Sequence, residues 1–157
     1  MVSVLIQEQV EAEHSGRAVS SGDDVTIRGV AGAGDAFMLG DRSEEPLPAR
    51  VEERVREAHA AARTHFGLIG IEWVFDGALV WILQMNAPRA APAAHSDDAA
   101  TDWIEFPFVP GAIDAFRHEV ESLRGTTRGI SVRGNVSPLS HLGEIAELAG
   151  VPVRFLR

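Results

Sequence analysis

A stretch from Asn86 to Asp102 divides the sequence, because it is rich in proline and alanine and has few residues able to build a core. Such a composition is typical of a semi-extended linker. On either side of it, apolar residues recur with the periods of strands and helices. A chain of 157 residues has room for one domain or two small ones. We therefore predict two units, residues 1–88 and 102–157, with a linker at residues 89–101.

The first unit has the pattern of a mixed α+β half. Short β-branched runs predict strands, apolar residues at steps of three or four predict one helix, and a turn signal predicts a hairpin. The expected strands are Val2–Ile6 and Val25–Val30, the helix runs from the prolines at 46 and 48 to Gly67, and the hairpin pairs Ile69–Val74 with Leu79–Met85 around Asp76-Gly77.

The second unit alternates strands and helices along the chain. The expected order is strand 104–109, helix 113–123, strand 129–132, helix 142–149 and strand 151–156. Alternation of this kind favours a parallel sheet, because a crossover helix must return the chain to the same end. The fold class predicted for the whole chain is α/β, an α+β half followed by a small parallel βαβαβ unit.

Charge and composition exclude several classes of function. A net charge of −9 argues against nucleic acid or an anionic membrane as partner, since both would repel the chain. The sequence has no cysteine, which excludes disulfides and zinc-thiolate sites. The N-terminal residues lack the basic region and long apolar run of a signal peptide, and no stretch approaches a transmembrane span. We therefore expect a cytoplasmic location.

Two oxygen-bearing side chains stand out in the expected hairpin. Glu72 and Gln84 lie in otherwise apolar strands. A two-residue loop at Asp76-Gly77 would place them on opposite faces, whereas a three-residue loop with Gly77 in a left-handed bulge position would place them on one face. Two hard oxygen donors on one face suit Mg²⁺ bound to nucleotide phosphates. The alternative is an edge hairpin whose polar residues simply face water.

Among the histidines, His141 has the most informative context. It follows Pro138-Leu139-Ser140 and opens an expected helix. A helix N-terminus gathers unpaired N–H groups and positive potential, so that a phosphate bonded there would be stabilised. Neutral imidazole is also a competent nucleophile toward phosphoryl groups. The alternative is a histidine at a helix start with no chemical role.

The first unit resembles the second half of the ATP-grasp domain in the phosphoenolpyruvate synthase and pyruvate phosphate dikinase family. The resemblance covers roughly residues 2–88. It is carried by the order and spacing of five segments: Gln7–Gly16, Gly32–Asp35, His65–Gly67, Ile71–Trp73 and Ile82–Gln84. The resemblance implies that Glu72 and Gln84 bind the metal ions of an ATP site, with Mg²⁺ as the ion, and that Gln7, Glu8 and Val10 contact the nucleotide.

The second unit resembles the swivelling phosphohistidine domain of the same family over roughly residues 102–157. The matching segments are Pro138–His141 and Ala149–Pro152, and the interval between them agrees with the family signature. In that family the histidine carries the phosphoryl group between sites. The resemblance therefore implies the same role, as the catalytic residue, for His141.

The chain also departs from the family pattern. Asn86 and Glu147 stand where the family has arginines, and the part matching the first ATP-grasp half is missing. The resemblance implies a phosphotransfer subunit that uses ATP, Mg²⁺ and a carrier histidine with a small-molecule acceptor, and that needs a protein partner supplying the first ATP-grasp half. The alternatives are a small phosphocarrier or binding protein without ATP chemistry, and a non-catalytic pseudoenzyme that serves as a scaffold subunit.

Overall fold

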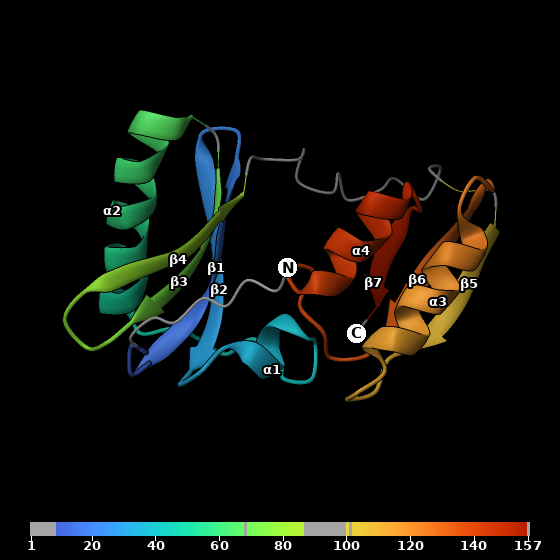
Figure 1. Cartoon of the computed structure of the whole chain (residues 1–157), viewed down its shortest axis with the longest axis horizontal. Coiled ribbons are helices and arrows are strands. Elements are labelled where there is room, and N and C mark those ends of the chain that lie inside the picture. The colour runs from blue at the N-terminus through green and yellow to red at the C-terminus, as the bar shows by residue number, and fades with distance from the viewer. Residues whose placement is uncertain (1–8, 68, 87–99, 101, 157) are drawn as a thin grey trace, which may run out of the picture.

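The computed structural model describes residues 9–67, 69–86, 100 and 102–156. It contains a four-stranded antiparallel sheet followed by a three-stranded parallel sheet, with helices against both (Figure 1). The chain is therefore a mixed α/β protein, as predicted. The expected linker lies almost entirely outside the described residues, so the domain boundaries stay a prediction.

The first sheet has the strand order β2-β1-β3-β4. Its members are β1 (His14–Ser21), β2 (Asp24–Ala31), β3 (Gly70–Phe75) and β4 (Val80–Asn86). Helix α2 (Ala49–Phe66) lies against one face of this sheet (Figure 1). The core between them contains Ala18, Ile27, Val51, Val55, Ala62, Ile69, Ile71, Trp73 and Phe75.

Sequence patterns predicted β2, α2 and the β3–β4 hairpin, and the structure confirms them. Two elements were not predicted, strand β1 and the one-turn helix α1 (Asp35–Met38), which begins directly after Gly34. The expected strand Val2–Ile6 lies outside the described residues.

The hairpin places Glu72 and Gln84 on one face, but not through the expected three-residue loop. Phe75 pairs with Val80, and the Asp76 N–H donates to the Leu79 carbonyl at 3.2 Å, so the turn itself has two central residues, Gly77 and Ala78. That register alone would put Glu72 and Gln84 on opposite faces. A β-bulge beside Glu72 inserts one extra residue into β4 and brings Gln84 directly opposite Glu72.

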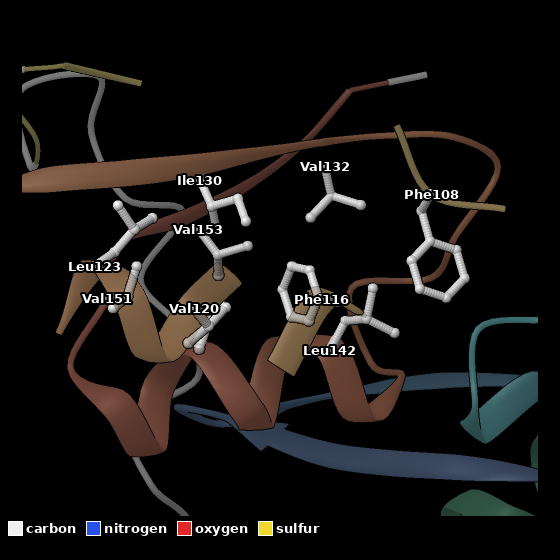
Figure 2. Packing of buried hydrophobic residues seen from close by; sticks show 10 residues of the cluster. Phe108, Phe116, Val120, Leu123, Ile130, Val132, Leu142, Val151 and Val153 are labelled. Atoms are coloured by element: carbon white, nitrogen blue, oxygen red, sulfur yellow. The ribbon is translucent and has the colours of Figure 1, made fainter. Parts of the chain in front are cut away.

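The second sheet has the order β5-β6-β7, and both neighbouring pairs are parallel, as predicted. Its elements are β5 (Asp102–Pro107), α3 (Ile113–Leu123), β6 (Arg128–Arg133), α4 (His141–Ala149) and β7 (Val153–Leu156). The two helices pack against the sheet through a separate core, and β1 and β2 pass on the other side of α4 (Figure 2). The central side chains of this second core are Phe116, Val120, Ile130, Val132 and Leu142.

The loop after α1 connects the first sheet to the second unit through hydrogen bonds. Asp41 accepts a hydrogen bond from the Gly111 N–H at 2.8 Å, and Ser43 donates one to the Asn135 carbonyl at 2.6 Å. Gly40 has a φ of +83°, and a Cβ there would lie 2.9 Å from Leu142 Cδ1. Glycine is required at this position, since any side chain would be strained in φ and would press against the second core.

Candidate functional site

Four polar side chains form a row across the first sheet. In the strand register, Arg28 on β2 lies opposite Arg17 on β1, and Arg17 lies opposite Glu72 on β3. Glu72 in turn lies opposite Gln84 on β4. Directly opposite residues of antiparallel strands point to the same face, with Cβ atoms about 4.5–5.5 Å apart. We call Arg28, Arg17, Glu72 and Gln84 the polar row.

The polar row faces away from helix α2. Ala18 and Ile71, each next in sequence to a member of the row, belong to the core that contacts α2. Because successive strand residues alternate between faces, Arg17 and Glu72 point to the opposite side. The face that bears the row is not polar throughout, because Val30 and Val74, which lie opposite Ser15 two positions from Arg17, are buried apolar side chains on it.

His141 is the first residue of α4, and its side chain is 38% exposed, in agreement with the predicted position. Its Nδ1 lies 3.3 Å from Oε2 of Glu144, one helical turn further on. A carboxylate only accepts hydrogen bonds, so we assign the neutral ring its proton on Nδ1. This tautomer leaves the lone pair on Nε2.

Two polar bridges connect the polar row to the loop and helix that carry His141. In the first, Arg17 lies 3.8 Å from Glu144 Oε2 and 3.4 Å from the Leu139 carbonyl oxygen. In the second, Glu44 lies 3.3 Å from the Arg28 Nε and accepts a hydrogen bond from Ser137 at 3.0 Å. Both arginines of the row therefore contact the segment around His141, directly or through one carboxylate.

The loop that carries Glu44 is fixed by its neighbours. Arg42 donates to the Ala31 carbonyl at 2.8 Å and to Glu45 at 2.6 Å. The Arg42 side chain, helped by the Ala31 N–H, holds the pKa of Glu45 below its ordinary value. Glu45 is thus ionised at neutral pH, and its bonds secure the approach of Glu44 to the second sheet.

A comparison with protein-family models gives no match for this chain. Comparisons with curated proteins and with solved structures give none either. Function is therefore inferred from the geometry of the site and from the sequence motifs.

The start of α4 has an uncommon cap. Ser140 has the extended backbone of an N-cap residue, yet its hydroxyl forms no capping hydrogen bond. This Oγ is buried and finds no partner among the described residues. The N–H groups of the first turn, from Leu142 and Gly143, are consequently not satisfied by a side-chain cap, which leaves them suited to an anion.

The donors for a metal ion are few. Within the described ranges, no group of three or more acidic or histidine side chains could hold an ion. Glu72 and Gln84 form only a pair, and the Gln84 amide nitrogen donates to Asn86 at 3.0 Å, which leaves the amide oxygen as its ligand atom. A pair of oxygen donors fits Mg²⁺ that takes its other ligands from phosphate and water.

Of the three residues that the resemblance assigns to the nucleotide, the structure describes only Val10. Gln7 and Glu8 lie outside the described residues, and Val10 is partly buried just before β1.

Of the helices that the structure describes, none has the length and apolarity to cross a bilayer.

Sequence reasoning missed Arg17 and Glu144 as members of the site. Glu144 had a readable signal, since it stands three residues after His141 on the same helix. Arg17 had none, because its place beside Glu72 follows only from the pairing of β1 with β3.

Proposed function

We propose that the chain is a phosphotransfer subunit in which His141 carries the phosphoryl group and the polar row faces the donor nucleotide. The observation that carries this proposal is the bridge from Arg17 through Glu144 to His141. It joins the sheet face bearing Glu72 and Gln84 to the candidate carrier. The resemblance of both units to one phosphotransfer family supports it independently.

The chemistry follows from the tautomer of His141. Glu144 holds the proton on Nδ1, and the Nε2 lone pair attacks phosphorus. The Nε2–P bond forms as the bond from phosphorus to the donor's bridging oxygen breaks, and the electron pair leaves on that oxygen. Arg17 offsets the charge of Glu144, which would otherwise repel the incoming phosphate.

Mg²⁺, when bound, would neutralise phosphate charge, and Glu72 and Gln84 are the residues that would hold it. The residues that resemble the family correspond to its second ATP-grasp half and its phosphohistidine domain, and we propose that a partner chain supplies the first half. Because the phosphoryl transfer would consume ATP, we propose a cytoplasmic location. A small molecule would be the final acceptor of the phosphoryl group.

One observation favours a second candidate, a non-catalytic scaffold subunit. Asn86, in the position of a family arginine, uses its side-chain oxygen to accept a hydrogen bond from Gln84. An amide there cannot neutralise the charge of a transferring phosphoryl group as an arginine would.

The test is site-specific labelling of the full chain. ATP radiolabelled in its β- or γ-phosphate is supplied with Mg²⁺, alone and with a chain carrying the first ATP-grasp half. We expect an acid-labile, base-stable label on His141 only in the presence of that chain, since the residues that resemble the family cover only half of its nucleotide clamp.

His141→Ala should abolish the label, and His118→Ala, which changes an exposed histidine on α3, should not. Label that survives His141→Ala would overturn the carrier role. Absence of label in every mixture would favour the scaffold.

A further inference from the structure

Strand β4 is an open edge of the first sheet, covered by no other strand among the described residues. Five of the nine exposed large apolar side chains that the structure describes lie on it or directly before it. They are Leu79, Trp81, Ile82, Leu83 and Met85. Apolar side chains this concentrated mark an interaction surface.

The other sheet edges carry charge, and β4 does not. The edge strands are β2, β4, β5 and β7. Arg28 lies on β2, Glu105 on β5 and Arg154 on β7, whereas Val80–Asn86 contains no charged side chain. Charges on an edge strand oppose pairing with another chain, and β4 lacks this protection.

We propose that β4 is the docking edge for β4 of a second copy of this chain, in an antiparallel, two-fold arrangement. Each copy carries a net charge of −9, so two copies repel wherever acidic surfaces face each other. An uncharged edge is the place where they meet without like charges. A two-fold axis brings the same apolar residues together from both copies, which makes the contact self-complementary.

The bulge in β4 limits the form of this contact. Because one extra residue interrupts the strand beside Ile82 and Gln84, backbone pairing extends over a short run on either side of it. The apolar side chains, among them Leu79 at 60% and Leu83 at 58% exposure, then supply most of the buried surface. The dimer uses the backbone and the apolar side chains of β4, and its test measures association alone, so it can fail without the proposed phosphotransfer failing, although the same strand carries Gln84.

Sedimentation velocity on the full chain tests the proposal first. We expect a monomer–dimer equilibrium that shifts toward dimer as salt is added, since screening removes the repulsion between two acidic copies. Leu83→Lys should weaken the dimer on the order of tenfold or more. Leu148→Lys changes a similarly exposed leucine on α4 and should leave the dimer intact.

Cysteine cross-linking then locates the contact, because the natural chain has no cysteine. Among Ile82→Cys, Leu83→Cys and Met85→Cys, at least one should give a disulfide-linked dimer on mild oxidation, as opposed Cα atoms lie within reach. Leu148→Cys should not. A monomer at all concentrations and salts, equal cross-linking at position 148, or a dimer unchanged by Leu83→Lys would overturn the proposal.

Discussion

The two sheets differ in how completely the helices of the same unit cover their faces and edges. The parallel sheet has α3 and α4 packed on it over a core of ten buried residues (Figure 2). The antiparallel sheet has α2 on one face, the polar row on the other and an apolar edge at β4. The parallel unit is thus closed largely by local sequence. The antiparallel unit depends on neighbours, α4 at the polar row and another chain at β4.

The largest effect should come from opening the closed unit. Phe116 is fully buried on α3 and packs edge-on against Phe106 at 5.4 Å between ring centroids. Phe116→Ala should cost about 3–5 kcal/mol through lost burial and the cavity left behind. Hydrogen exchange measured by mass spectrometry should show faster exchange in β6 and much smaller change in β3.

Val109→Ala is the matched control, because this side chain is exposed, and it should change stability by less than about 0.5 kcal/mol. Equal acceleration of exchange in both sheets after Phe116→Ala would show that they unfold as one unit, and the comparison would fail.

An intermediate effect should follow from removing the bridge between the units. Arg17 is only 13% exposed, and its loss leaves Glu144 without its cation. Arg17→Ala should therefore cost about 1–2 kcal/mol in denaturant unfolding, with faster hydrogen exchange at the start of α4. Arg28→Ala, at a side chain 49% exposed, should cost less than about 1 kcal/mol. If the two variants behaved alike, the polar row would not be what couples the sheets.

The smallest effect concerns the hairpin tip and depends on pH. The Leu79 N–H, the Trp81 indole and the Ala78 N–H all donate to Asp76, and these bonds hold its pKa below the ordinary value. A lowered folded-state pKa means that the contribution to stability is complete above the ordinary aspartate pKa. It is lost as pH falls through the folded value.

Acidification from the ordinary aspartate pKa to below the lowered pKa of Asp76 should shift the NMR resonance of the Trp81 indole N–H before the sheet unfolds. Asp76→Ala should abolish this pH response. An indole resonance that is insensitive to acid in the natural chain would contradict the assignment.

The sequence predicted most of the elements because their patterns are local. Helices α2 and α3 show apolar residues at helical steps, and Gly67 and Gly150 end α2 and α4. Strand β1 was missed because Ser15, Gly16 and Arg17 have no apolar alternation. It becomes a strand because β2 and β3 pair with it on both sides.

The candidate site was predictable in its parts and not in its assembly. Glu72, Gln84 and His141 stood out by residue type and context. Their relation through Arg17 depends on which strands pair and on how α4 docks against β1, which are contacts between residues far apart in the chain. The bulge was equally unreadable, because a turn signal defines the loop and not the register beyond it.

The bulge beside Glu72 also separates two evolutionary pressures within one hairpin. Since the extra residue of β4 sets the register of the Glu72–Gln84 pair, a change in loop length by two residues at Gly77-Ala78 would leave that pair opposed. Loss of the bulge with Leu83 retained would instead place Leu83 opposite Glu72 and turn Gln84 to the other face. Among related sequences, the hairpin tip can therefore vary in length by two residues, while a sequence that loses the bulge should also lose one residue of β4 if the Glu72–Gln84 pair is to be kept.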